Sequence, residues 1–139
     1  MIVLNKPYVT IERDDEMKCL IQTWKGFAKS NEFRAAINDS LAFFVKGGID
    51  KIISDTKEFS LVKKEDTDWV AQVITPQMVQ HGLRYMAFVV PKNVFTKISV
   101  DNFKEGANSV VSIRYFDEVA LAKQWLTEAE SEKKEASEA

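Results

Sequence analysis

Residues 84–90 (RYMAFVV) place the strongest limit on the folds open to this chain. The run is apolar at almost every position and is followed directly by Pro91, so it predicts a strand that stops there. A strand that is apolar nearly throughout, rather than at alternate positions, is typical of a sheet with helices over both faces. The run therefore indicates an α/β protein with this strand buried within its sheet.

The remaining segments alternate between strand and helix patterns. Residues 9–13 and 17–24 are rich in β-branched and aromatic side chains, and the acidic trio 14–16 between them predicts the turn of an antiparallel hairpin. Apolar periodicity, glycines and prolines then predict, in order, a helix over 30–46 with Ser30 as its N-cap, a strand over 49–55, a helix from about 65, the strand 84–90, a helix from about 93, a strand over 110–116 and a last helix after Asp117.

The predicted fold class is α/β, with a single mixed β-sheet in the element order ββαβαβαβα. The opening hairpin is antiparallel, whereas each strand–helix–strand unit requires parallel pairing with a right-handed crossover. Two details stay open. Residues 1–4 form either an added edge strand or an arm packed across the sheet, and Thr75 and Pro76 either kink the second helix or begin another short one.

A chain of 139 residues has room for one hydrophobic core rather than two. We expect residues 1–127 to form a single domain. Residues 128–139 are charged, alanine-rich and without an apolar stripe, so we expect them to form a frayed or disordered tail.

Composition narrows the classes of function. The net charge of −2 argues against general nucleic-acid binding, which needs a basic patch for the phosphates. No apolar run approaches the roughly 20 residues of a membrane span, and residues 1–16 lack the pattern of a secretory signal. The single cysteine, Cys19, can form no internal disulfide, which agrees with a reducing compartment. We therefore expect a cytoplasmic protein that neither binds nucleic acid nor spans a membrane.

Ligand and regulatory sites in open α/β sheets lie beyond the carboxyl ends of the strands. We therefore place the site in residues 55–68, called here the switch loop, which follow the central strand. Cations at a helix start oppose the helix dipole, so the lysine pair 63–64 is either simply solvated or, with the helix amides, contacts an anion or a phosphoprotein. The candidate partner-contact or anion-contact residues are Asp55, Thr56, Lys63, Lys64, Asp66, Thr67 and Trp69.

We expect no catalytic, cofactor-binding or metal-binding residues. His81 has no second histidine or cysteine near it to complete a metal site or a triad, and the pattern around Cys19 is that of a buried structural thiol. The acids of the switch loop could be a carboxylate pair or a hard-metal site, but solvated loop acids and the charge of a helix start explain them more simply. The sequence therefore favours a protein without enzymatic activity.

Several short stretches carry a family resemblance: Trp24-Lys25-Gly26-Phe27, Glu32-Phe33-Arg34, Asp55, Trp69, Val90-Pro91 and Tyr115-Phe116-Asp117. With the element order over about residues 8–127, they resemble the STAS domain of sulfate transporters and anti-sigma-factor antagonists, especially its stand-alone bacterial SpoIIAA-like relatives. The resemblance implies a regulatory module that binds a partner protein through the switch loop and the helix after it, or that forms a homodimer. The CRAL-TRIO lipid-transfer domain shares a related topology and implies the alternative, a small carrier of a lipid or another apolar ligand.

In the regulatory relatives, a serine that follows an aspartate at this helix start is phosphorylated and controls binding to a partner kinase. This chain has KKEDT over residues 63–67 instead, which leaves Thr67, or Thr56 and Ser60 earlier in the loop, as hydroxyls for a phosphate. A phosphate on Thr67 would lie among three carboxylates and meet like-charge repulsion. We therefore predict that Thr67 is not a phosphoacceptor and that the lysine pair contacts an acidic partner or an anion from outside.

Overall fold

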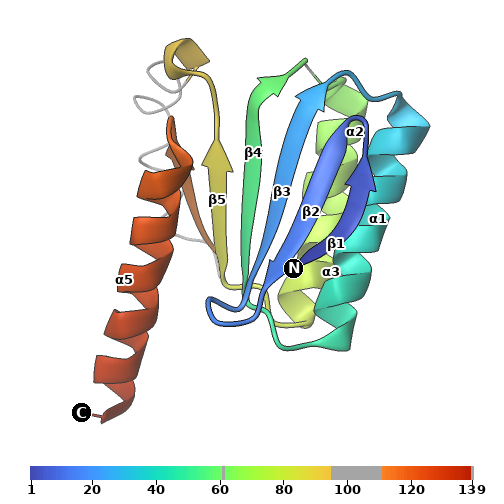
Figure 1. Ribbon diagram of the computed structural model, residues 1–139. Coiled ribbons are helices and arrows are strands. Elements are labelled where there is room, and N and C mark those ends of the chain that lie inside the picture. The colour runs from blue at the N-terminus through green and yellow to red at the C-terminus, as the bar shows by residue number, and fades with distance from the viewer. Residues whose placement is uncertain (61, 95–110, 139) are drawn as a thin grey trace.

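The computed structural model describes residues 1–60, 62–94 and 111–138, of which residues 130–138 are described by their backbone alone. Within these residues six strands form one sheet, whose order across the sheet follows the order along the chain (Figure 1). The strands are β1 (Ile2–Lys6), β2 (Val9–Asp14), β3 (Cys19–Gly26), β4 (Lys51–Phe59), β5 (Tyr85–Val89) and β6 (Ser112–Phe116). The predicted α/β class with a single mixed sheet is confirmed.

The sheet has an antiparallel half and a parallel half. Strands β1, β2 and β3 pair antiparallel in sequence, and β3, β4, β5 and β6 pair parallel. The alternative left open for residues 1–4 is thereby decided, because β1 is an edge strand that is hydrogen-bonded to β2. The turn between β2 and β3 covers residues 15–18 rather than 14–16, because Asp14 still pairs with Cys19.

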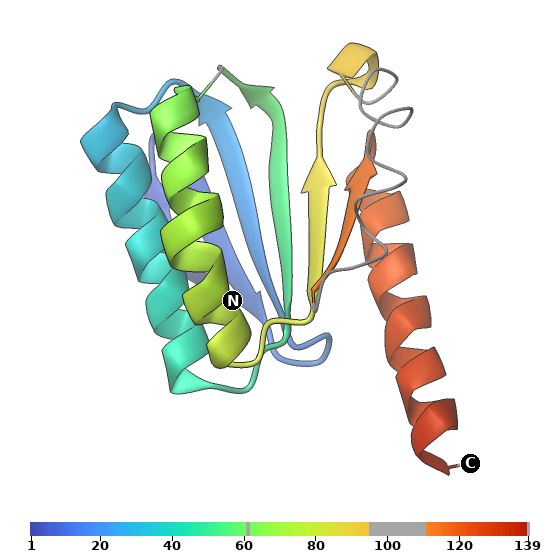
Figure 2. The same cartoon turned by 180° about the vertical axis from the view of Figure 1, so that it is seen from behind.

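Helices lie on both faces of the sheet. One face carries α1 (Ser30–Lys46) and a continuous helical segment made of α2 (Lys64–Trp69), the π-helical turn η1 (Val70–Ile74) and α3 (Thr75–Gln80), which stand in front of the sheet in Figure 2. The opposite face carries α5 (Val119–Glu138), which packs on β4, β5 and β6 (Figure 1). The strand β5 is therefore covered on both sides, as its apolar sequence predicts.

Two hydrophobic cores result, one on each face of the sheet, so the expectation of one core rather than two is wrong: a sheet covered on both faces buries apolar residues on each. The larger core lies between the sheet and the α1–α3 side and includes Trp24, Phe33, Phe44, Ile52, Ile74 and Met86. The smaller core lies under α5 and is made of Cys19, Ile21, Ile53, Ala87, Val89, Ala122 and Leu126. The apolar periodicity of the helices predicts that Val45, Val73 and Leu121 face inward, but all three are exposed.

The ends of the first helix differ in one respect from the prediction. Lys29, not Ser30, occupies the N-cap position of α1, and Ser30 is the first helical residue. The helix ends as predicted at Gly47, which has a φ of +88° and donates its N–H to Phe44 O. A φ in this range suits glycine, because any side chain would clash with the backbone there.

Pro76 explains the π-helical turn. Proline has no N–H and its ring clashes with the carbonyl four residues before it, so a regular α-helix cannot run through it undisturbed. In η1 the N–H of Thr75 bonds to Val70 O, five residues back, and the wider turn lets the helix continue. The side-chain amide of Gln77 donates to Val73 O at 2.8 Å and satisfies that carbonyl. The helix is thus neither stopped nor restarted at Thr75.

Three further predictions meet different outcomes. The strand β4 continues to Phe59, so the first part of the switch loop is strand rather than loop. The helix expected from about 93 lies outside the described residues except for Asn93 and Val94, which are helical together with Lys92. The backbone of 128–138, expected to be a frayed tail, is helical in α5, and Ala129 is buried.

Candidate functional site

The seven candidate residues fall into two groups. Asp55 and Thr56 lie inside β4: Asp55 pairs with Thr23 of β3 and Val89 of β5, and its carboxylate accepts the N–H of Lys57 at 3.1 Å. The hydroxyl of Thr56 donates to Val89 O at 3.0 Å. Asp55 lies in the strand, as the predicted strand over 49–55 has it, whereas the expectation that the loop begins at Thr56 is wrong. Their polar side chains next to a charged run had suggested the end of the strand.

The other group surrounds the start of α2, as predicted. Lys63 is its N-cap and is exposed, and Lys64 pairs with Asp68 one turn further on, with 3.1 Å between Nζ and Oδ2. The hydroxyl of Thr67 donates to Lys64 O at 2.9 Å, so it is bonded within its own helix. That Thr67 is not a phosphoacceptor stays a prediction.

Asp66 is not the solvated acid that its place in a charged run indicated. It is 3% exposed, and its Oδ1 atom accepts hydrogen bonds from Arg34 Nε and Ser30 Oγ of α1, each at 2.8 Å. The bond from Arg34 is the largest cause that lowers the pKa of Asp66, and the bond from Ser30 adds to it. Arg34 also lies over the ring of Trp69, with its Cζ atom 4.7 Å from the ring centroid. This cluster fixes α2 against α1, and Trp69 is half-buried within it rather than free to cage a ligand.

A pocket of about 150 Å³ opens beside this cluster, where the chain leaves β3 and β4. Its walls come from the segment that joins β3 to α1, from the last residue of β4 and from the start of α2. The lining residues are mostly apolar, with three charged residues among them: Phe27, Ala28, Lys29, Ser30, Phe33, Phe59, Val62, Lys63 and Asp66. The pocket lies at the carboxyl ends of the parallel strands β3 and β4, the edge of the sheet at which we expect a ligand site. It does not lie at a point where strand order reverses, because the order does not reverse in this sheet.

Phe33 and Phe59 form the aromatic wall of the pocket, and Trp24 packs against both. This residue is 2% exposed, and its ring centroid lies 5.1 Å from that of Phe33 and 5.1 Å from that of Phe59. The indole N–H of Trp24 donates to Gln22 Oε1 at 3.2 Å, which fixes the orientation of the ring. Aromatic groups at such separations attract one another, so this wall is preformed.

Gln22 is the centre of a buried polar network. Its Oε1 atom also accepts from Ser54 Oγ at 2.7 Å, and its Nε2 atom donates to Ser40 Oγ at 2.8 Å. Ser40 in turn donates to Ala36 O at 3.0 Å. Because each buried polar group finds a partner, the network joins β3, β4 and α1 rigidly behind the pocket.

The rim of the pocket combines exposed apolar and basic side chains. Phe27 follows the glycine that ends β3 and is 67% exposed, and Val62 is half-buried. Lys29 and Lys63 are both exposed, and neither forms an ion pair with a carboxylate in the part of the chain that the structure describes. Phe27, Lys29, Val62, Lys63 and the pocket between them are called the pocket face below.

Cys19 and His81 both lie outside the pocket face. Cys19 is fully buried, and burial raises its pKa to about 12, so its reactive thiolate form is strongly disfavoured. His81 is exposed at the end of α3, where its backbone N–H donates to Gln77 O and Met78 O. Among residues 1–60, 62–94 and 111–138, no three His, Cys, Asp or Glu side chains gather as metal ligands would, and no helix is long and apolar enough to cross a membrane.

No protein-family model matches this chain, and no curated protein matches it either.

Sequence reasoning missed several residues of the site. Arg34 and Ser30 were not connected with Asp66 because hydrogen bonds between residues 32 and 36 positions apart leave no periodic signal. Phe27 did leave a signal, since a large aromatic residue directly after the glycine that ends a strand belongs to neither the strand nor the helix pattern. Lys29 and Val62 carried no signal that separates them from ordinary surface residues.

Proposed function

We propose that this protein is a non-enzymatic interaction module, of STAS-like architecture, that binds another protein at the pocket face. The observation that carries the proposal is the pocket itself: an aromatic wall fixed by buried hydrogen bonds, open to solvent beside an exposed phenylalanine. Preformed pockets that accept one large side chain, ringed by residues that exclude water, are the usual centres of binding energy in protein interfaces.

The size of the pocket favours a protein over a small-molecule ligand. Sites for drug-sized ligands and cofactors usually enclose about 300–1,000 Å³. The present pocket, at about 150 Å³, is smaller than that range and suits a single side chain. A lipid carrier, the alternative implied by the CRAL-TRIO resemblance, would need a far larger apolar cavity.

Site-specific photo-crosslinking in the cell of origin tests the proposal. A photoreactive benzoylphenylalanine in place of Phe27 should form a covalent adduct with another protein, because the side chain projects beside the pocket. The same substitution at Leu121, an exposed apolar residue of α5, is the matched control and should form far less adduct. An adduct of twice the mass of the chain would identify the partner as a second copy.

The proposal fails if position 27 forms no protein adduct, or forms no more than position 121 does. Native mass spectrometry of the purified protein is the complementary measurement. A stoichiometric apolar small molecule that the Phe27 variant no longer carries would assign the pocket to a carrier instead.

A further inference from the structure

We propose that the pocket face binds an acidic linear segment of the partner, in which one large apolar side chain enters the pocket and carboxylates on either side of it contact Lys29 and Lys63. This inference rests on the proposed function and adds the chemistry of the partner. It is carried by the charges of the pocket lining, by the positions of the two lysines and by the pocket's shape.

The charges around the pocket do not cancel. Three of its lining residues are charged, and the carboxylate among them, Asp66, is already occupied by Arg34 and Ser30 of the same chain. Lys29 and Lys63 have no carboxylate within ion-pair distance in the described residues. The first-turn acid of α1, Glu32, accepts the backbone N–H of Lys29 at 2.9 Å and does not line the pocket. The lining therefore offers a ligand two lysines outside any ion pair in the described residues, of which Lys63 also helps to lower the pKa of Asp66, and no carboxylate without a partner.

Both lysines stand where a helix would favour another residue. Lys29 is the N-cap of α1 and Lys63 is the N-cap of α2, and neither side chain caps its helix. Ser, Thr, Asp and Asn are preferred at N-caps, where they accept a backbone N–H, and cations are disfavoured by the dipole. Because the same costly exception occurs on two separate segments that meet at one pocket, a ligand with negative charge is the simplest explanation of both.

The shape of the site favours a peptide over a membrane surface. Phe33 is buried and Phe59 half-buried, so these two rings of the pocket can receive a side chain but cannot themselves enter a lipid layer, and among the aromatic residues of the lining Phe27 alone is exposed. Stable attraction to anionic lipids generally needs clusters of about 4–8 basic residues, more than the two lysines of the rim. An acidic partner segment instead satisfies the cations and the pocket together.

Selection from a phage-displayed library of random dodecamer peptides on the wild-type protein tests the inference. We expect the selected peptides to share one Leu, Ile, Met or Phe flanked by Asp or Glu. Binding of a labelled consensus peptide, followed by fluorescence anisotropy, should weaken about tenfold or more in the Lys29→Glu/Lys63→Glu variant, because charge pairing across an interface is reversed there. Rising salt should weaken it in the wild type as well.

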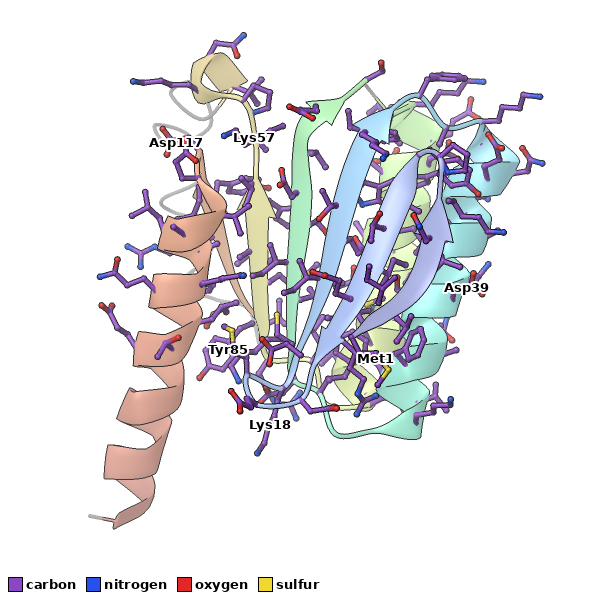
Figure 3. The ribbon with its side chains drawn as sticks, in the orientation of Figure 1. Met1, Lys18, Asp39, Lys57, Tyr85 and Asp117 are labelled. Atoms are coloured by element: carbon purple, nitrogen blue, oxygen red, sulfur yellow. The ribbon has the colours of Figure 1, made fainter. Side chains whose placement is uncertain are left out.

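Two variants serve as controls. Lys18→Glu/Lys123→Glu makes the same change in net charge at exposed lysines outside the pocket, Lys18 lying in the turn at the opposite end of the sheet (Figure 3), and should bind the peptide as the wild type does. Phe27→Ser alters an exposed side chain, so it should fold normally while it loses the apolar part of the binding.

The outcomes separate the inference from the function it rests on. Selected peptides that depend on Phe27 but carry no acidic bias, or whose binding survives reversal of both lysines, overturn the inference and leave a protein-interaction face. A selection that yields no Phe27-dependent peptide counts against both. Lysine-dependent binding to phosphatidylserine vesicles without any selected peptide would overturn the inference in favour of a membrane surface.

Discussion

Asp66 is the residue whose environment departs most from its sequence context. Its carboxylate accepts two hydrogen bonds from α1, and those bonds lower its pKa because they favour the charged form. A group whose pKa is lowered by folding contributes stability above its unfolded pKa, about 3.9 for aspartate, and loses that contribution as the pH falls through the folded pKa. The α1–α2 junction is therefore expected to be sensitive to acid.

We expect Asp66→Asn to lower the free energy of unfolding at neutral pH by about 1–3 kcal/mol, because the carboxylate that accepts from Arg34 and Ser30 is replaced by an uncharged amide oxygen, a weaker acceptor. Arg34 is 39% exposed, so water can take over part of its hydrogen bonding and keep the loss in this range. The difference from the wild type should shrink below a pH of about 4. Urea denaturation of both proteins across this pH range measures it. Asp68→Asn, at an exposed ion pair of the same helix, should change little at any pH.

A substitution at Lys18 should instead raise the free energy of unfolding. It is the one residue other than glycine with a positive φ, +57°, in the part of the chain that the structure describes, and its carbonyl accepts the N–H groups of Asp50 and Lys51. A left-handed conformation costs most residues about 1–2 kcal/mol, and asparagine tolerates it better. We expect Lys18→Asn to raise the free energy of unfolding by about 0.5–1 kcal/mol in thermal or urea denaturation. Glu16→Asn, in the same turn without a positive φ, should bring no gain.

At the scale of single residues, sequence reasoning predicted location better than environment. It correctly expected a buried Cys19, a helix-end His81 and lysines at the start of α2. It could not predict that Asp66 is buried, because its partners lie on another helix. A charged residue in a charged run looks solvated until the fold brings a partner to it.

At the scale of elements, the polar network around Gln22 joins two strands and a helix. Gln22→Met keeps the size of the side chain but leaves Ser54 Oγ and Trp24 Nε1 without their acceptor. Each buried polar group left unpaired costs about 1–3 kcal/mol, so we expect a loss of about 2–5 kcal/mol in chemical denaturation. The Gln22→Met/Ser54→Ala variant should recover part of the loss. A loss for Gln22→Met as small as that of a surface substitution would show that water satisfies these groups.

The element boundaries show which physical signals the sequence carries. Apolar periodicity and terminating glycines predicted α1 and the strands β2, β3, β5 and β6 within a few residues. The end of β4 was missed because Thr56 to Glu58 are polar, although Glu58 and Phe59 pair with Lys25 and Gly26 of β3 after a shift in register, and the ring of Phe59 packs on that of Trp24. The π-helical turn was missed because proline within a helical pattern predicts a break, and the wider turn that accommodates it has no sequence signature.

At the scale of the whole molecule, one sheet separates two cores that depend on different helices. The element order predicted a mixed sheet, but the order of strands across it and the faces taken by the helices follow from crossovers that no periodicity records. The pocket face lies at the carboxyl ends of β3 and β4, next to the antiparallel part of the sheet. On the other sheet face, α5 closes the smaller core over Cys19, Ile53 and Val89.

The single thiol reports directly on that closure. Cys19 is fully buried with its pKa raised to about 12, so a thiol reagent such as Ellman's reagent should label it only when the smaller core opens. Leu126→Ala removes a fully buried side chain of α5 and should lower the free energy of unfolding by about 2–5 kcal/mol, with a matching rise in the labelling rate. Leu121→Ala, at an exposed position of the same helix, should leave both quantities near those of the wild type. Removal of residues 131–139 should also change little, since this stretch of the sequence has no apolar stripe to bury. Rapid labelling in the truncated chain would show that this segment docks, and wild-type labelling in Leu126→Ala would mean that α5 is not what protects the thiol.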